Sequence, residues 1–243
     1  MGLSTNVVWH QTTFKGLEAI IQSKKLKCSY SLETIKWKGS TKNIAFPMIS
    51  FCDIPLSDIG EYLGKYGPYT IGFKSKWAKS KGLSLVWYRY VEALSLRNQM
   101  DSFKNLGGKC KEWTESEKSL WYSIAYTKNY DGELKKYGFS SYRFYDEREL
   151  RYVPDFNSLV GQNEKPFISE EDYQGLKKSK GSTFVEGFDL GFDVNDIEYV
   201  LISERNQFKN VKGLFDRDVS HITFLSHRQI EQDIIGQSHN RKK

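Results

Sequence analysis

The residues of this chain best suited to chemistry lie in the segment 145–152, whose sequence is YDERELRY. Glu147, Glu149 and Arg151 follow one another there at a spacing of two. If the segment is a strand, these three side chains point to one face, because side chains alternate along a strand. Three ionisable groups on one face need a cleft, a charged partner or water. The segment therefore predicts either a functional site or a solvated face of a sheet.

The two glutamates allow several chemical interpretations. As metal ligands they lack a third ligand in the sequence, and as a glycosidase pair they can be tested only by their separation. In a nucleotide-dependent transferase, one carboxylate would stabilise a developing oxocarbenium ion and the other would orient the acceptor. The simplest alternative is structural: both glutamates pair with Arg143, Arg148 or Arg151, and composition alone favours this slightly.

Further candidate residues lie at the ends of predicted strands. His10 ends a strand and precedes a helix capped by Thr12 or Thr13, and such a junction suits an anion or a ribose. A half-buried histidine beside Trp9 is the alternative, and chemistry alone favours it. Ser50 stands near another strand end. Tyr69, like its neighbouring tyrosines, serves packing or stacks on a planar ligand ring.

Composition limits the classes of protein that this chain represents. It has 243 residues, of which 39% are hydrophobic, enough for one sizeable core. The net charge of +6 permits an anionic partner such as nucleic acid or a dinucleotide without requiring one. Three widely separated cysteines indicate neither a zinc site nor a disulfide framework, so we expect no metal and a cytoplasmic location. No apolar run is long enough to cross a membrane.

The pattern of elements predicts one α+β domain over residues 1–243, with a mixed or antiparallel sheet and flanking helices. We expect a loop over 28–43, a surface insertion near 155–182 and a basic tail over 237–243. The expected strands cover 7–10, 44–52, 69–73, 85–90, 140–153, 197–202 and 222–225. The expected helices cover 13–23, 76–81 and 91–103, with another opened by a capping box at 114–117. The chain has no glycine-rich phosphate loop and no G-x-S-x-G motif.

Four blocks of sequence together resemble a known family. They are WH at 9–10, IAFPMISFCDIPL at 44–56, YGPYTIGF at 66–73 and YDERELRYVP at 145–154. These blocks resemble the AbiGi family of abortive phage-infection proteins over about residues 7–225. The blocks FCDIP and E-x-E-x-R are the most specific, although many members carry Trp where this chain has Leu150. The family is described as a phage-resistance antitoxin.

The same pattern is also similar to DarT-like ADP-ribosyltransferases, which implies a fold and an activity. The implied fold is an α+β split sheet that binds NAD in a cleft between two small sheets. The implied activity is transfer of ADP-ribose from NAD to a macromolecular acceptor, nucleic acid (RNA or DNA) in particular, which would block phage propagation. Glu149 would be the catalytic residue, and Glu147 would direct the acceptor. Such a toxin would need an antitoxin or chaperone partner.

The resemblance also implies where NAD binds. His10, with Thr12 beside it, would contact the NAD ribose, and Tyr69 would lie under the nicotinamide. Ser50 is the alternative middle residue of the triad. NAD would be a substrate, and no metal is implied.

Two other functions compete with the transferase. In a non-catalytic antitoxin or phage-sensing protein, Glu147, Glu149 and Arg151 would form an internal ion network. A nuclease or another nucleic-acid-binding protein would depend on a metal, for which the ligand spacing is poor.

Overall fold

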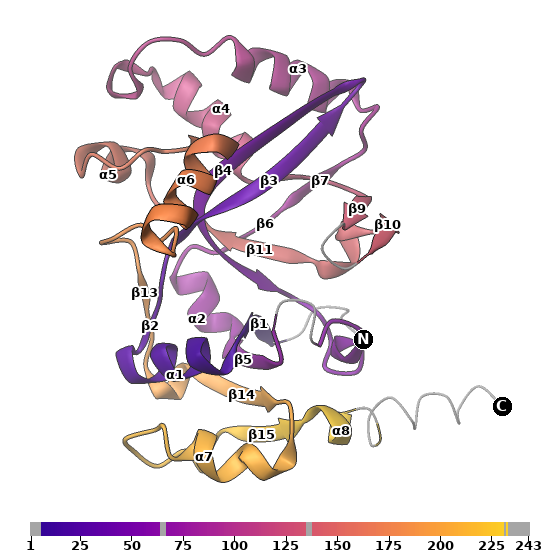
Figure 1. Ribbon diagram of the computed structural model, residues 1–243, viewed down its shortest axis with the longest axis vertical. Helices are drawn as coiled ribbons and strands as arrows, with labels where there is room; N and C mark the ends of the chain where they lie inside the picture. Colours follow the sequence, from indigo (N-terminus) through magenta and orange to yellow (C-terminus); the bar gives the residue numbers. More distant parts are fainter. Residues whose placement is uncertain (1–5, 64–66, 135–137, 231, 233–243) are drawn as a thin grey trace, which may run out of the picture. The chain divides into compact units, whose positions relative to one another are not determined.

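The structure, a computed structural model, describes residues 6–63, 67–134, 138–230 and 232 (Figure 1). The chain divides into two compact units, and each is described by itself. Unit 1 takes its residues from 1–26, 51–82 and 190–243, and unit 2 from 27–50 and 83–189. The single domain expected over 1–243 stays a prediction, and the expected basic tail over 237–243 lies outside the described residues.

Unit 1 is built on a mixed sheet with the strand order β15-β14-β5-β1. Its strands are β1 (Val7–Thr12), β5 (Tyr69–Lys74), β14 (Ile197–Ile202) and β15 (Thr223–Ser226). The pair β14 and β15 is parallel and the other pairs are antiparallel. Trp9 of β1 also pairs with Cys52, the last residue of β4 (Ser40–Cys52). A separate two-stranded sheet joins β2 (Lys25–Leu26) and β13 (Leu190–Gly191).

Short helices complete unit 1. They are α1 (Phe14–Ser23), α2 (Ser75–Ser80), α7 (Phe208–Lys212), α8 (His227–Gln229), and the 3-10 helices η1 (Ile59–Glu61), η5 (Val194–Asp196) and η6 (Arg205–Gln207). The predicted first helix is confirmed, with Thr13 as its N-cap accepting a hydrogen bond from the Gly16 amide at 3.1 Å. Its apolar side chains Leu17, Ile20 and Ile21 are buried.

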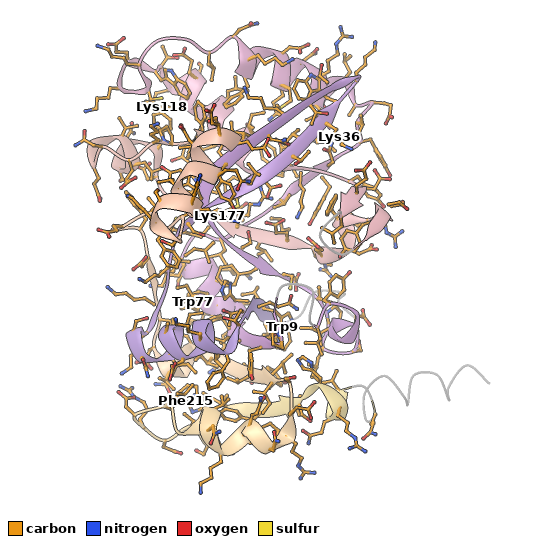
Figure 2. The ribbon with its side chains drawn as sticks, in the orientation of Figure 1. Trp9, Lys36, Trp77, Lys118, Lys177 and Phe215 are labelled. Atoms are coloured by element: carbon orange, nitrogen blue, oxygen red, sulfur yellow. The ribbon has the colours of Figure 1, made fainter. Side chains whose placement is uncertain are left out.

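The pair β1 and β5 has two differently packed faces. On one face, Trp9 belongs to a hydrophobic cluster and donates its indole N–H to the Ile54 carbonyl oxygen at 2.7 Å. Gly72 of β5 stands directly opposite Trp9, where the absence of a side chain leaves room for the indole ring. On the other face, Phe73 stacks on Trp77 of α2 with ring centroids 4.5 Å apart. Figure 2 shows Trp9 and Trp77 within unit 1.

Unit 2 contains a long antiparallel hairpin that the sequence did not predict. β3 (Ser29–Trp37) pairs with β4 in continuous register from Ser29 opposite Met48 to Trp37 opposite Ser40. Lys38 and Gly39, both with positive φ, form the turn. The expected loop over 28–43 is therefore wrong. Its polar residues belong to strands whose partner lies only a few residues further along the chain.

The other strands of unit 2 are short. They are β6 (Ser84–Leu85), β7 (Trp87–Arg89), β8 (Thr127–Asn129), β9 (Gly132–Leu134), β10 (Phe139–Tyr142), β11 (Glu149–Tyr152) and β12 (Ile168–Ser169). β11 lies between β4 and β6, and β7 pairs in parallel with β8.

The helices of unit 2 are α3 (Leu94–Lys104), α4 (Glu115–Ala125), α5 (Phe156–Gly161), α6 (Glu170–Lys180), and the 3-10 helices η2 (Cys110–Glu112) and η4 (Phe144–Glu147). The segment 155–182, expected as a surface insertion, contains α5, β12 and α6. Phe156 and Leu159 of α5 are buried, whereas α6 has no buried residue. β12 pairs with Ala45 and Ile44 of β4.

The structure confirms an α+β fold with a mixed sheet. The more specific ADP-ribosyltransferase-like split sheet stays a prediction. Within the described part of the chain, no helix combines the length and the apolar character needed to cross a bilayer.

Candidate functional site

The candidate site lies in unit 2, where η4 meets β11. The prediction that Glu147, Glu149 and Arg151 share one strand is wrong for Glu147, which ends η4. Arg148 follows in the left-handed conformation (φ 44°) and turns the backbone into β11. Only Glu149 and Arg151 therefore share a face of β11. Even so, all three side chains belong to one buried ion network.

Arg151 is the centre of this network and is completely buried. Its Nε donates to Oε1 of Glu149 at 2.7 Å, and its Nη2 donates to Oε2 at 3.2 Å. Nη2 also donates to Oε1 of Glu33 at 2.6 Å. Nη1 donates to the carbonyl oxygen of Ala125 at 2.7 Å, at the C-terminus of α4, where a cation is favoured. Arg151 thus joins β11 to β3 and α4.

Lys128 is the second cation of the network. Its Nζ lies 2.8 Å from Oε2 of Glu149 and 3.1 Å from Oε2 of Glu147. The same ammonium group lies 5.0 Å from the centroid of the Phe144 ring. The Tyr142 hydroxyl donates to the other oxygen of Glu147 at 3.1 Å. Lys128 therefore separates two carboxylates that would otherwise repel each other.

Ser50 and Tyr88 complete the surroundings of Glu149. Ser50 Oγ donates to Glu149 Oε1 at 2.8 Å, and the Glu149 amide donates to the Tyr88 hydroxyl at 2.8 Å. The Glu149 carboxylate thus accepts four hydrogen bonds, from Ser50, Lys128 and two nitrogens of Arg151. A carboxylate offers about four lone-pair positions, so its acceptor capacity is filled. Glu149 is only 5% exposed.

Burial and neighbouring charges shift the pKa values of Glu149 and Glu33 in opposite directions. Burial by itself would raise the pKa of Glu149, but Arg151 and Lys128 outweigh it and hold that pKa well below its usual range. Glu33 behaves in the opposite way, because burial raises its pKa and the cations only partly offset this. Burial and the charge of Glu149 raise the pKa of Tyr88, so this hydroxyl stays protonated.

The structure brings the residues predicted to contact NAD into two groups. His10, Thr12 and Tyr69 lie on one face of β1 and β5 in unit 1, with Thr12 directly opposite Tyr69. The His10 ring lies 5.4 Å from that of Phe51. Tyr69 is buried, and its ring centroid lies 5.4 Å from that of Phe14, which is 38% exposed.

The other predicted site residues, Ser50, Glu147 and Glu149, belong to the network in unit 2. Of the arginines expected to pair with the glutamates, Arg151 does so, whereas Arg143 pairs with Asp146 at 2.7 Å. Nothing in the described residues assembles three or more His, Cys, Asp or Glu side chains into a metal-binding group.

Sequence reasoning missed four members of the network, namely Glu33, Tyr88, Lys128 and Tyr142. Glu33 lies in the segment interpreted as a loop. Lys128 follows Thr127, which is buried, and precedes Asn129, which is also buried. Thr127, Lys128 and Asn129 are all polar, so the sequence shows no alternation there that would have singled out Lys128.

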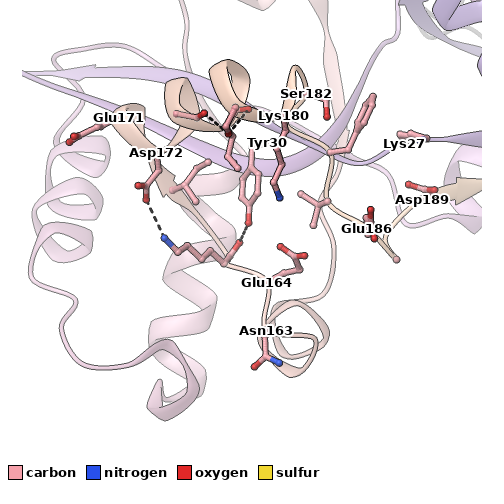
Figure 3. A pocket seen from close by; sticks show the side chains of 18 residues that line it. Lys27, Tyr30, Asn163, Glu164, Glu171, Asp172, Lys180, Ser182, Glu186 and Asp189 are labelled. Carbon is pink, nitrogen blue, oxygen red and sulfur yellow. Dashed lines mark hydrogen bonds and ion pairs between the residues drawn. The ribbon is translucent and has the colours of Figure 1, made fainter.

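A groove of about 1090 Å³ forms a separate concavity of unit 2 (Figure 3). Its walls come from α6, the segment 182–189 and Tyr30, whose hydroxyl donates to the Lys165 carbonyl oxygen at 2.7 Å. Lys165 in turn pairs with Asp172 at 3.2 Å. Carboxylates and ammonium groups both line this groove, so its charge alone defines no class of ligand.

The fold and the site define an α+β protein with a buried ion network in its second unit. Comparison with known proteins then gives the family. Residues 23–203 match the family described as "Putative abortive phage resistance protein AbiGi, antitoxin". This match covers well over half of the chain, so the chain belongs to the AbiGi family.

A curated relative agrees with this family. The protein named "Abortive phage resistance protein AbiGi" from Lactococcus lactis subsp. cremoris is 28% identical over 198 residues, which cover 70% of this chain and 77% of the relative. No solved structure matches the chain. Membership of the family supports a role in anti-phage defence. It bears out the resemblance to AbiGi, whereas similarity to DarT-like enzymes stays a prediction.

Proposed function

We propose that this chain acts in anti-phage defence by binding a partner protein, as an antitoxin does, and not by catalysis. In this role the network of Glu147, Glu149 and Arg151 stabilises unit 2. The observation that carries the proposal is the filled acceptor capacity of Glu149, which accepts four hydrogen bonds and is 5% exposed. The family description, which includes the word antitoxin, agrees with this role.

Buried ion pairs suit a structural role for a physical reason. A buried charge is tolerated only when partners replace the water that it has lost, and removing one partner is strongly destabilising. Arg151 satisfies two carboxylates and one helix-terminal carbonyl oxygen at once. A substrate that approached Glu149 would have to displace Arg151, Lys128 or Ser50.

Expression of the chain alone in a bacterial host tests this proposal. An antitoxin alone leaves growth unchanged, whereas a toxin arrests growth. The purified chain should also melt at the same temperature with and without millimolar NAD, because a ligand that binds only the native state raises the melting temperature. Growth arrest, together with a rise in melting temperature on addition of NAD, would overturn the antitoxin proposal.

A second candidate function is ADP-ribosyl transfer from NAD, which one contact favours. Ser50, which the resemblance gives as the alternative middle residue of the triad, donates a hydrogen bond to Glu149 at 2.8 Å. Ser50 and Glu149, to which the resemblance gives roles in the same triad, are thus in contact within unit 2. The resemblance assigns NAD contacts to His10, Thr12 and Tyr69.

In the transferase, Glu149 would accept a hydrogen bond from the ribose 2′-hydroxyl after giving up one of its present donors. The bond between ribose C1′ and the nicotinamide nitrogen would break, and its electron pair would leave with nicotinamide. Glu149 would stabilise the oxocarbenium ion that remains. Glu147 would direct the acceptor, RNA or DNA. A nucleophilic atom of the acceptor would attack C1′, and its proton would pass to solvent.

Label transfer from adenylate-labelled NAD into lysates of uninfected and infected cells distinguishes the two functions. Protein, DNA and RNA fractions are counted for the wild type, for Glu149→Gln and for Asp146→Asn as a matched surface control. Transferase activity predicts label in one fraction with the wild type and the control only. The absence of label from every fraction, with all three proteins folded by circular dichroism, would refute the transferase.

A further inference from the structure

The groove of unit 2 follows one face of α6 (Figure 3). The residues of α6 that line it are spaced four apart in two adjacent rows, which are Glu171, Gly175 and Ser179, and Asp172, Leu176 and Lys180. Residues four apart lie on the same side of a helix, so this side of α6 forms a continuous wall of the groove.

One face of the sheet supplies an apolar floor for the groove. Tyr30 of β3 stands opposite Pro47 of β4, and Ile168 of β12 pairs with Ala45 of β4. Pro47 and Ala45 are two residues apart, and side chains two apart on a strand share a face, so Tyr30 and Ile168 lie on the same side of the sheet. Both side chains are buried and line the groove. The groove therefore combines a helical wall with an apolar floor.

Gly175 leaves the middle of the helical wall open. A glycine inside a helix is less stable than an alanine, and Gly175 lies in the interior of α6. A Cβ at this position would meet nothing within 4 Å, so no neighbouring group of the described chain requires a glycine there. What this glycine provides is room in the groove, at a cost in helix stability.

Two half-buried carboxylates, Glu164 and Asp189, line the groove and come from segments that touch each other. The Gln162 side-chain oxygen lies 2.7 Å from where a Cβ on Gly187 would stand. Within the described residues, neither Glu164 nor Asp189 forms an ion pair shorter than 4.0 Å. These two carboxylates are therefore close enough to act on the same neighbours, and no internal cation neutralises them.

Buried groups beneath the groove respond to these two charges. Burial, followed by the charges of Asp189 and Glu164, raises the pKa of the Cys28 thiol to about 12. Burial and then the charge of Glu164 also raise the pKa of Tyr30. Cys28 and Tyr30 are two residues apart and so lie on one side of the chain there. Glu164 and Asp189 thus make the potential negative at the floor of the groove.

Pairing inside the groove leaves an excess of negative charge. Five carboxylates and three ammonium groups line it. Lys165 pairs with Asp172 at 3.2 Å, which leaves four carboxylates and two ammonium groups. One of these two, that of Lys27, lies 4.9 Å from the centroid of the Phe184 ring. The charge that remains is complementary to a cation.

We propose that this groove is where the chain binds its partner protein, and that it receives a segment of that protein carrying a lysine or arginine side chain. The inference rests on the proposed antitoxin role and adds the place and the chemistry of the contact. The apolar stem of the lysine or arginine would lie on Tyr30 and Ile168, and its charged end would contact Glu164 and Asp189. The net charge of +6 over the whole chain opposes a cationic ligand, so the attraction must come from these local carboxylates.

Selection of short random peptides on the folded wild-type chain supplies the probe, and the selected peptides should be enriched in lysine or arginine. The most enriched peptide is synthesised with a fluorescent label and titrated by fluorescence anisotropy. The double variant Glu164→Gln, Asp189→Asn should weaken its binding by about tenfold or more, as the loss of hydrogen bonds between charged groups implies. The matched control is Glu92→Gln, Asp131→Asn, which removes two exposed carboxylates of unit 2 that do not line the groove, and its affinity should equal that of the wild type.

The variant Gly175→Leu separates binding from stability. Leucine is a better helix former than glycine, and its Cβ would stand in open space, so the melting temperature should stay equal or rise. The added side chain would occupy the groove, so the affinity for the peptide should fall. A general loss of folding would lower the melting temperature and the affinity together. Melting temperatures of all variants are therefore measured alongside the titrations.

Several results would overturn the inference. They are the selection of no peptide, selected peptides without an excess of basic residues, equal affinities of the two double variants, and full affinity of Gly175→Leu. The expression and NAD experiments test the antitoxin role separately. Growth arrest and NAD binding, together with peptide binding that depends on the groove, would refute the antitoxin role and leave the groove as a site for basic segments. Unchanged growth, together with peptide binding that ignores the groove, would refute the groove alone.

Discussion

Arg151 and Glu149, two residues apart on β11, form a bidentate ion pair with nitrogen–oxygen distances of 2.7 and 3.2 Å. Arg151 is completely buried and Glu149 almost so. The planar guanidinium matches the two carboxylate oxygens in a way that a lysine ammonium does not. The same guanidinium reaches Glu33 of β3, so one side chain ties two neighbouring parts of unit 2 together.

Replacing Arg151 by Met should destabilise the protein by about 3–5 kcal/mol, because Glu33 and Glu149 would lose their buried partner. Urea denaturation followed by circular dichroism measures this loss. Arg143→Met is the matched control, since the pair of Arg143 with Asp146 is exposed, and its denaturation midpoint should hardly change. Equal midpoints for the two variants would contradict a structural role for the network.

The pH dependence of the free energy of unfolding should show that the ionised Glu149 carboxylate stabilises the folded protein. Its folded-state pKa lies below the unfolded value of about 4.3, so the unfolded state binds more protons between the two values. The stability that Glu149 contributes is thus complete near neutral pH and is lost as the pH falls below about 4. The difference in unfolding free energy between the wild type and Glu149→Gln should narrow over that range.

Glu33, whose pKa is raised, acts in the opposite direction, and the charge of Glu149 is one cause of that shift. Because Glu149→Gln would therefore also change the Glu33 pKa, both proteins of this comparison carry Glu33→Gln, so that Glu33 no longer titrates. Chemical denaturation at a series of pH values provides the measurement. A difference that stays constant from neutral pH into strong acid would show that Glu149 is not held ionised by its partners.

Gly72→Ala should destabilise unit 1. A Cβ at this position would lie 2.7 Å from the Trp9 ring and 2.8 Å from Val7, closer than carbon atoms pack. The hydrogen bond from Trp9 to the Ile54 carbonyl oxygen restrains the ring, so overpacking should cost about 1–3 kcal/mol. Gly191→Ala is the control, since nothing lies within 4 Å of its Cβ. Thermal denaturation should give a lower melting temperature for Gly72→Ala than for Gly191→Ala. Similar melting temperatures would show that the Trp9 ring can move aside without cost.

Cys28 should resist alkylation in the native protein. Its thiol is completely buried, and burial together with the charges of Asp189 and Glu164 raises its pKa to about 12. The thiolate is the reactive form, so iodoacetamide at neutral pH should modify Cys28 only after unfolding in urea. Peptide mapping by mass spectrometry reads this directly, with the less buried Cys110 as internal comparison. Modification of Cys28 and Cys110 at similar rates in the native protein would contradict this prediction.

Local sequence signals predicted several elements correctly. The capping box of Thr114 and Glu117 opens α4, and the Thr114 amide donates to a Glu117 carboxylate oxygen at 2.7 Å. Ser169 caps α6 by the same kind of contact, within the segment expected as a surface insertion. Such contacts span three residues, so sequence spacing alone specifies them. The hairpin of β3 and β4 was missed because its polar positions resemble a loop, and only pairing along its length stabilises it as strands.

By itself the sequence determined which ionisable residues lie close together at 147–151, and that Glu149 and Arg151 share a strand face. Tertiary structure alone decided their partners. Lys128 reaches Glu149 from 21 residues away, and Glu33 reaches Arg151 from 118 residues away. The charge state and accessibility of a carboxylate depend on burial and on cations that fold against it. These are properties of the packed chain, which residue spacing along the sequence does not contain.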